Sequence, residues 1–260
     1  MSNISNKCDD FELPLFVGTD ENTQDLFMDF ACVRRLLIIG DSGEGKSTLA
    51  SNMILSLMQQ LSPEQCQIAL IDTRLLEFPL LENAKHIHSK AFSVEDALDC
   101  LQHLDEIIRE RYRILAKAEC ARISDYNAKS KEKLPYIVCF IDEIADMLVN
   151  YPDKATELLQ RVCNGGPVGV FLIAATKELM PEVFSAEIRL LFKNFITFEI
   201  SEAKCDVDYI KVYLDGIEPW NLKKLGQHVL KMEYDEPMVL QGKLITDEEI
   251  EQKIASLSGK

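Results

Sequence analysis

Short apolar runs recur along the chain and predict buried strands. They occupy Leu36–Ile39, Cys66–Asp72, Tyr136–Ile141, Gly169–Thr176 and Phe195–Ile200. Tyr136–Ile141 is apolar throughout, as is typical of parallel strands whose two faces are both covered. We therefore expect a central, mostly parallel sheet.

Between these runs, apolar residues recur at helical spacing. Lys46–Leu61 is expected to form a helix, and Ser93 is expected to cap a long amphipathic helix that reaches Lys117. Further helices are expected at Pro152–Val162, Glu182–Leu191, Val207–Leu214 and, after a capping box at Thr246–Glu249, up to Leu257. Strands that alternate with helices predict an α/β fold with helices on both faces of the sheet.

The two ends of the chain predict additional β structure. Leu13–Gly18 and Asp25–Ala31 flank a turn-rich segment and predict a small N-terminal β-hairpin. Late strands are expected at Gln227–Glu233 and Pro237–Ile245, as a second hairpin. Residues 1–12 are expected to be a flexible leader. No stretch rich in Pro, Gly or Ser marks a linker, so residues 13–260 are expected to be a single domain.

Two other segments carry weaker patterns. Thr73–Ile87 has little periodicity and is expected to be a loop with short turns. Arg109, Arg111 and Arg113 fall on the outer face of the long helix. We interpret them as a solvated charged face rather than as a binding site.

The strand at Leu36–Ile39 leads into Gly40–Ser47, which fits the phosphate-binding pattern G-x-x-x-x-G-K-[ST]. Glycines let the loop curl so that its amides cradle phosphate oxygens, and Lys46 reaches the β- and γ-phosphates. Ser47 offers a hydroxyl to Mg²⁺, and the helix N-terminus favours an anion. The predicted nucleotide-binding residues are Gly40, Asp41, Ser42, Gly43, Glu44, Gly45, Lys46, Ser47 and Thr48. The alternative is a Gly-rich turn that binds nothing, but the strand before it and the helix after it favour the phosphate loop.

Carboxylates follow the strand at Tyr136–Ile141. Asp142 is expected to hold Mg²⁺, and Glu143 to orient and deprotonate the attacking water. Thr176, at the end of the next strand, is a candidate sensor of the γ-phosphate between the loop and Glu143. The alternatives are an acidic junction between strand and helix and a threonine that ends a strand. Ligands bind at the carboxyl ends of parallel strands, which favours the functional interpretation.

Composition narrows the class of protein. The chain has 260 residues, 47% of them hydrophobic, and a net charge of −15. This charge repels nucleic acid on average, so any nucleic-acid contact needs a local basic patch or the pore of an assembly. The eight cysteines form no C-x-x-C pair, and the four histidines have no metal-ligand spacing. No apolar run could span a membrane and no signal peptide is recognisable, so a cytoplasmic protein is expected.

Several segments together resemble the motor domain of the FtsK/SpoIIIE family of DNA translocases. They are Leu13–Asp20, Leu36–Ser47, Met53–Leu57, Ser62–Glu64, Ile71–Glu77, Glu110–Arg113, Asp125–Asn127, Leu134–Val138, Ile141–Asp146 and Gly169–Thr176. The resemblance covers roughly residues 13–200. It implies a RecA-like fold, binding and hydrolysis of ATP with Mg²⁺, and a homo-oligomeric ring, usually a hexamer. It also implies that duplex DNA is threaded through the ring.

The chain departs from the family after the sensor strand. Lys177, Glu178 and Leu179 stand where the family usually has Gln-Arg-Pro, and Phe195 stands where an arginine is expected. In the family these elements serve the contact between subunits and the grip on DNA.

Three functions remain open at this point. The first is an ATP-driven translocase of duplex DNA. The second is a nucleotide-dependent regulatory or assembly module with a protein partner and weak or partner-dependent hydrolysis. For the assembly, a hetero-oligomer in which a partner supplies the missing trans arginine is the alternative to a homo-oligomer. The third is the ATPase subunit of a protein secretion machine. Lys177 is a candidate substitute for the missing trans cation.

Overall fold

A single sheet organises the chain. The computed structural model describes residues 4–75 and 78–258, so parts of the expected leader, loop and domain (1–3, 76–77 and 259–260) lie outside the described residues. Within the described residues, eleven strands form one sheet in the order β1-β3-β2-β11-β10-β9-β4-β8-β7-β5-β6. The half from β9 to β6 is parallel, and the half from β1 to β10 is joined by antiparallel pairs.

The parallel half contains every strand that the apolar runs predict. Its strands are β4 (Arg35–Ile39), β5 (Cys66–Ile71), β6 (Ile87–Ala91), β7 (Tyr136–Ile141), β8 (Val170–Thr176) and β9 (Phe195–Phe198). The central position of β4 places β8 on one side and β9 on the other. The loops that follow β4, β5, β7 and β8 therefore meet at one edge, which is where such sheets bind ligands.

The antiparallel half joins the two chain ends. Its strands are β1 (Ile4–Ser5), β2 (Pro14–Thr19), β3 (Asp25–Asp29), β10 (Gln227–Lys231) and β11 (Met238–Gln241). Both predicted hairpins are present, and they are linked because Thr19 of β2 pairs with Gln241 of β11. Within the expected leader, Ile4 and Ser5 pair with β3, so these two residues are held against the sheet.

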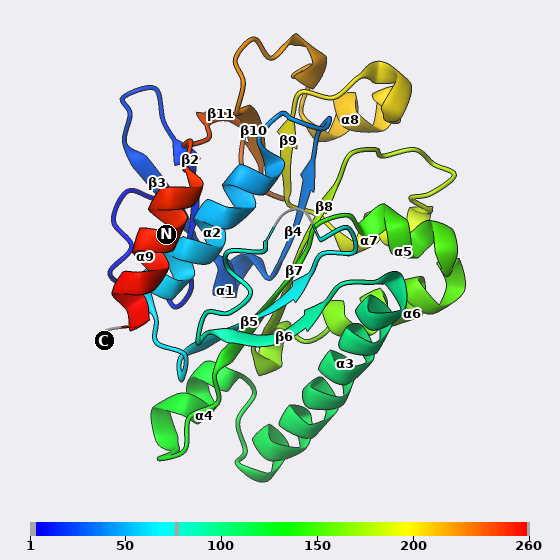
Figure 1. The fold of residues 1–260 in the computed structure, drawn as a ribbon. Coiled ribbons are helices and arrows are strands. Elements are labelled where there is room, and N and C mark those ends of the chain that lie inside the picture. Colours follow the sequence, from blue (N-terminus) through cyan, green and yellow to red (C-terminus); the bar gives the residue numbers. More distant parts are fainter. Residues whose placement is uncertain (1–3, 76–77, 259–260) are drawn as a thin grey trace.

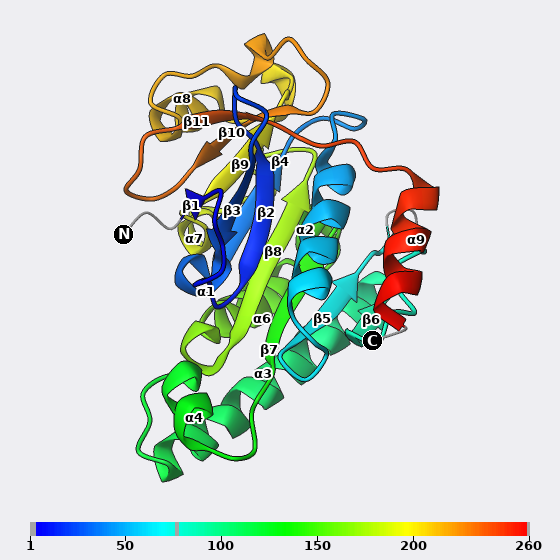
Figure 2. The same cartoon turned by 90° about the vertical axis from the view of Figure 1, so that its left-hand side faces the viewer.

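Helices cover both faces of the sheet (Figure 1, Figure 2). The helices are α1 (Phe30–Val33), α2 (Lys46–Gln60), α3 (Val94–Lys117), α4 (Ile123–Lys129), α5 (Ile144–Asn150), α6 (Pro152–Cys163), α7 (Ala186–Leu191), α8 (Val207–Tyr213) and α9 (Asp247–Ser258), with short 3-10 turns at Gly166–Val168, Glu202–Lys204 and Pro219–Asn221. α2 and α9 lie on one face, and α3, α5, α6 and α7 lie on the other. None of the described helices is long and apolar enough to cross a membrane.

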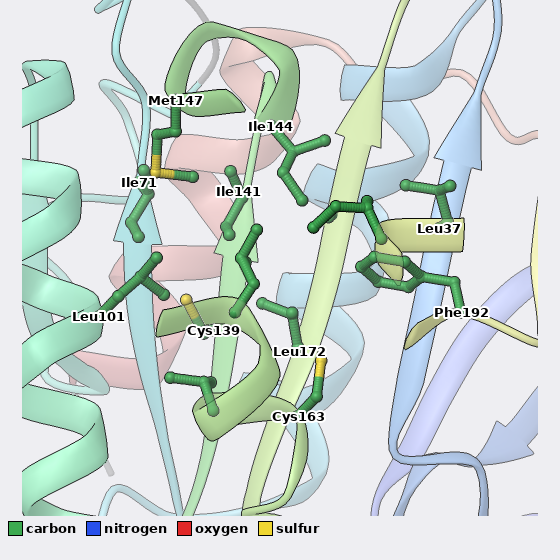
Figure 3. Packing of buried hydrophobic residues seen from close by; sticks show 14 of the residues in the cluster. Leu37, Ile71, Leu101, Cys139, Ile141, Ile144, Met147, Cys163, Leu172 and Phe192 are labelled. Carbon is green, nitrogen blue, oxygen red and sulfur yellow. The ribbon is translucent and has the colours of Figure 1, made fainter. Parts of the chain in front are cut away.

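Each face of the sheet has its own hydrophobic core. On the α3 side, Leu101 of α3 and Met147 of α5 pack over Ile71, Cys139 and Ile141 of the strands (Figure 3). On the other side, the buried face of α2 packs against β2 and the alternate residues of the same parallel strands. Both faces of β7 and β8 are buried, which explains why their sequences are continuously apolar.

Two helices, α3 and α9, have the N-terminal caps that the sequence predicts. The Ser93 side chain accepts a hydrogen bond from the Asp96 amide, 3.0 Å away, at the start of α3. At α9 the Thr246 hydroxyl accepts from the Glu249 amide at 3.3 Å, and the Glu249 carboxylate accepts from the Thr246 amide at 2.9 Å. This reciprocal pair confirms the predicted capping box.

The prediction for the arginines of α3 is wrong at one position. Arg111 is buried, and its guanidinium donates to the carbonyl oxygens of Val168 and Gly169 at 3.0 and 3.4 Å. Burial lowers the pKa of this guanidinium to about 10. Arg111 is therefore a core residue that satisfies two carbonyls before β8, whereas Arg109 and Arg113 remain largely exposed.

Other differences concern short elements. The sequence did not predict α4, α5 or the edge strand β6, whose residues alternate between half-buried and exposed. α7 begins only at Ala186, capped by Ser185, rather than at Glu182. These elements are short or half-exposed, so their stability depends on tertiary packing more than on their own pattern.

Candidate nucleotide site

The phosphate loop lies between β4 and α2, as the sequence predicts. Gly43 and Gly45 have φ values of 88° and 110°, a region in which side chains are strained. Gly45 is also the N-cap of α2, and among the described residues no side chain caps this helix end. The amides of the first turn thus face the loop, where an anion would meet them.

Lys46 folds back onto its own loop. Its ammonium donates to the carbonyl oxygens of Gly40 and Asp41, at 2.8 and 2.9 Å. These bonds hold the side chain across the loop.

A cleft of about 420 Å³ lies beside the loop. It is lined by Ser42, Gly43, Gly45, Lys46, Ser47, Thr48, Arg74, Asp142, Glu143 and Lys177. Most of the predicted phosphate-binding residues and both predicted carboxylates therefore share one space. Thr176 is not in the lining, but it touches Glu143 directly.

Glu143 is held by the end of the next strand. Its carboxylate accepts from the Thr176 hydroxyl at 2.8 Å and from the Lys177 amide at 3.3 Å. β7 and β8 pair in register, with Ile141 opposite Ala174, so the residues after each strand lie side by side. The structure thus brings together Glu143 and Thr176, and the role of Thr176 as a γ-phosphate sensor stays a prediction.

Electrostatics at Glu143 suit a proton acceptor. Only 4% of the residue is exposed, and burial raises the pKa of its carboxyl above the ordinary value. The bond from Thr176 and the charges of Lys177 and Arg74 oppose that rise in part. A carboxylate with a raised pKa is a stronger base than one in water.

Arg74 was not predicted as a site residue. Its guanidinium binds the Asp146 carboxylate through two hydrogen bonds of 3.0 and 2.7 Å, and the Thr73 hydroxyl donates to the same carboxylate at 2.8 Å. Burial raises the pKa of Asp146, but these donors outweigh it and leave that pKa below its ordinary value. Because β5 lies beside β7, the turn after β5 reaches the cleft. The pairing of β5 with β7 cannot be recognised from the sequence pattern, so Arg74 could not be predicted as a site residue.

Asp41 and Glu44 lie outside the cleft lining. The Asp41 carboxylate accepts from the Ser201 amide at 3.1 Å and from Lys204 at 2.8 Å, and its amide donates to the Glu199 carbonyl. The Glu44 carbonyl accepts from the Gly226 amide at 3.2 Å. Burial raises the pKa of the Glu44 carboxyl, helped by the nearby charges of Glu199 and Asp41. Both residues fasten the loop to segments around β9 and β10.

The residues in the cleft fit a magnesium ion bound together with phosphates. Ser47 and Asp142 supply a hydroxyl and a carboxylate oxygen to the same space, and Mg²⁺ prefers such oxygen ligands. Within the described parts of the chain, no group of three or more His, Cys, Asp or Glu could hold a metal alone. Mg²⁺ in such sites takes one or two protein ligands and completes its shell with phosphate oxygens and water.

The fold and the site define a class: this chain is a RecA-like P-loop ATPase domain. Its sequence matches the FtsK/SpoIIIE family over residues 5–181, more than half of the chain. The chain therefore belongs to the FtsK/SpoIIIE family.

Individual relatives agree with this assignment. The chain is 29% identical over 252 residues to a DNA translocase FtsK of Treponema pallidum, covering 94% of this chain and 31% of that protein. It is 28% identical over 202 residues to the DNA translocase FtsK of Borreliella burgdorferi, covering 75% of this chain and 26% of that one. The chain thus spans about a third or less of these relatives.

Two solved structures share the fold. The cytoplasmic domain of the Thermomonospora curvata type VII secretion ATPase EccC matches with a TM-score of 0.81 and 20% identity, over 96% of this chain and 31% of that one. The pCW3 conjugation coupling protein TcpA, solved with ATPγS, matches with a TM-score of 0.78 and 19% identity, over 96% and 72%. At such identities the likeness is one of fold.

Proposed function

We propose that this chain is the motor domain of a cytoplasmic translocase that hydrolyses ATP and moves duplex DNA through a ring of subunits. One observation carries the hydrolytic part. The buried Glu143, fixed by Thr176, faces the same cleft as Lys46, Ser47 and Asp142.

Each residue has a role in the proposed reaction. The loop amides and Lys46 bind and orient the phosphates, and Ser47 and Asp142 would hold Mg²⁺. When bound, this ion offsets the charge that develops on the phosphates. Glu143 accepts a proton from the attacking water, and the bond from Thr176 keeps its carboxylate aimed at the cleft. Burial of Glu143 favours this proton transfer because it makes the carboxylate more basic.

The family supports the DNA part of the proposal. The relatives described above are DNA translocases, and the matched segment includes the complete phosphate loop and both carboxylates. The net charge of −15 means that DNA contact must come from a local surface, such as the inner wall of a ring.

The test is an ATPase assay with and without duplex DNA, run at several salt concentrations beside a mass measurement with ATP. We expect duplex DNA to stimulate turnover and to lose this effect as salt rises, because phosphate contacts are screened. Glu143→Gln is the inactive control. An ATPase rate that does not change with duplex DNA but rises with a polypeptide would instead indicate a secretion ATPase. ATP binding without turnover would indicate a regulatory module.

A further inference from the structure

The turn after β5, residues 73–75, carries an arginine into the phosphate cleft. Among the described residues that line the cleft, Arg74 has the only guanidinium. β5 pairs with β7 as far as Ile71 and Ile141, and the Asp142 amide donates to the Ile71 carbonyl at 2.9 Å. The turn therefore begins beside Asp142, the carboxylate that would hold Mg²⁺.

The guanidinium of Arg74 is held along one edge. Its Nε and Nη2 atoms donate to the two carboxylate oxygens of Asp146, and the Thr73 hydroxyl donates to one of them. Nη1 makes no hydrogen bond to any other residue that the structure describes. A guanidinium has five N–H donors in a fixed planar arrangement, so the donors on Nη1 remain for a second acceptor.

The acceptor of this pair belongs to the same helix start as the proposed base. Glu143 is the N-cap of α5, and the Asp146 amide donates to the Glu143 carbonyl at 3.3 Å. The side chains of Arg74 and Asp146 are 37% and 24% exposed, so the ion pair borders open space and is not part of the core. Arg74 is thus fixed next to Glu143 with one edge accessible.

The backbone of the turn is fixed as well. Leu75 has a φ of 57°, a region in which a residue other than glycine is strained. The carboxylate of Asp72, which is buried, accepts from the amides of Arg74 and Phe78 at 3.2 and 3.3 Å. Strained backbone persists where the surroundings determine the conformation. Arg74 therefore needs little rearrangement to meet a ligand, which strengthens its electrostatic effect.

The order of the strands places Arg74 opposite the phosphate loop. The loop follows β4, Glu143 follows β7 and Arg74 follows β5, and the sheet runs β4-β8-β7-β5. A triphosphate held by the loop and pointing toward Glu143 has its γ-phosphate nearest to Arg74. The hydrogen bond to Asp146 raises the pKa of the Arg74 guanidinium, and the charges of Glu143 and Asp142 add to this rise. The guanidinium is therefore always charged.

We propose that Arg74, oriented by Asp146 and Thr73, donates from Nη1 to an oxygen of the γ-phosphate and so lets the site distinguish a nucleoside triphosphate from a diphosphate. The proposal rests on nucleotide binding by the P-loop, which belongs to the proposed function, but not on DNA or on the ring. The competing interpretation is a purely structural ion pair that fastens α5 to the turn after β5. The accessible edge and the place of Arg74 in the cleft lining favour the phosphate contact.

The test compares two nucleotides that differ in the γ-phosphate. Isothermal calorimetry with Mg²⁺ gives the affinities of the full chain for ATPγS and for ADP. Arg74→Ala should weaken ATPγS binding about ten- to a hundredfold, since a charge-assisted hydrogen bond is lost, and should leave ADP binding unchanged. Arg74→Gln, which keeps an amide donor for Asp146, carries the same expectation if the alanine variant does not fold.

Two matched variants separate the phosphate contact from a structural role. Asp146→Asn weakens the same ion pair but keeps the guanidinium, so it should reduce the preference for ATPγS less than Arg74→Ala does. Arg109→Ala breaks the ion pair with Asp105 on α3, outside the cleft lining, and should leave both affinities unchanged.

Three outcomes would overturn the proposal. One is a ratio of ATPγS to ADP affinity in Arg74→Ala equal to that in Arg109→Ala. Another is an equal loss in Arg74→Ala and Asp146→Asn, which would make the ion pair structural. The third is a parallel loss of ATPγS and ADP binding, which would indicate a disturbed site. A wild-type chain that binds neither nucleotide would instead refute the proposed function, so the two failures are distinguishable.

Discussion

The Thr176 hydroxyl lies 2.8 Å from the Glu143 Oε1 atom, and this bond joins the ends of two neighbouring strands beside the cleft. The same hydroxyl lies 2.9 Å from the Glu178 carbonyl oxygen. A hydroxyl has a single proton to donate, so these two acceptors compete for it. The orientation of the Glu143 carboxylate therefore depends on which of the two oxygens accepts the hydrogen bond from the Thr176 hydroxyl.

Thr176→Val tests this bond. A hydrogen bond to a charged group contributes about 1.5–3 kcal/mol, so turnover should fall about ten- to a hundredfold. Because the Thr176 bond lowers the pKa of Glu143, its loss should raise that pKa further. The acid side of the kcat–pH profile should then move to higher pH. Thr176→Ser, which keeps the hydroxyl, should retain the wild-type profile, and an unmoved profile in Thr176→Val would contradict the role of the bond.

Glu143→Gln removes the proposed base and keeps the shape of the side chain. General-base catalysis contributes about 10²–10⁴ in rate, so kcat should fall by that factor. ATP affinity should stay close to that of the wild type, as measured with a fluorescent analogue. Glu182→Gln, at an exposed glutamate in the loop before α7, is the control. Undiminished turnover in Glu143→Gln would remove Glu143 from the mechanism.

Lys46→Ala should remove most of the nucleotide affinity. The loss of two charge-assisted hydrogen bonds to phosphate, about 3 kcal/mol in all, corresponds to roughly a hundredfold weaker binding. Isothermal calorimetry with ATPγS measures it, and Lys154→Ala, an exposed lysine on α6, is the control. Wild-type affinity in Lys46→Ala would contradict the assignment of the P-loop.

Lys177 supplies a cation from within the same chain. It lines the cleft beside Glu143, where the family usually has glutamine. If it stabilises charge on the transferred phosphate, Lys177→Ala should lower kcat about tenfold without weakening ATP binding, and Lys177→Arg should keep most of the rate. Equal turnover in Lys177→Ala and the wild type would show that the charge comes from elsewhere.

Arg111→Ala tests the buried arginine of α3. The change leaves the Val168 carbonyl without the guanidinium donor, weakens the bonding of the Gly169 carbonyl, which keeps the Ile137 amide, and opens a cavity, so it should cost about 2–4 kcal/mol in the free energy of unfolding. Urea denaturation measures this loss. Arg113→Ala, on the exposed face of the same helix, should stay within about 0.5 kcal/mol of the wild type. Equal stabilities would mean that Arg111 is not structural.

The parts of the site that lie in one continuous segment could be predicted from the sequence. Gly40–Ser47 adopts its shape through its own glycines and the helix that follows, and Asp142 and Glu143 simply follow an apolar strand. Thr176 could be predicted because the strand before it is equally apolar. These predictions needed only the rule that parallel strands end at one edge.

The remaining parts depend on which strands are neighbours. Arg74 reaches the cleft because β5 lies beside β7, and Gly226 reaches the loop because β10 lies beside β9. The spacing of apolar residues along the chain does not determine the order of the strands in the sheet. Arg111 was misassigned for a similar reason, since a charged residue on a helix reads as exposed unless the carbonyls that it satisfies are known.

Main-chain hydrogen bonds connect the phosphate loop to the segments on both of its sides. The Asp41 amide holds the Glu199 carbonyl just after β9, and the Glu44 carbonyl holds the Gly226 amide just before β10. From β10 the hydrogen-bonded ladder continues through β11 and β2 to β3. The N-terminal hairpin is therefore connected to the phosphate loop by a continuous series of main-chain hydrogen bonds, a connection that does not depend on the side chains of the hairpin.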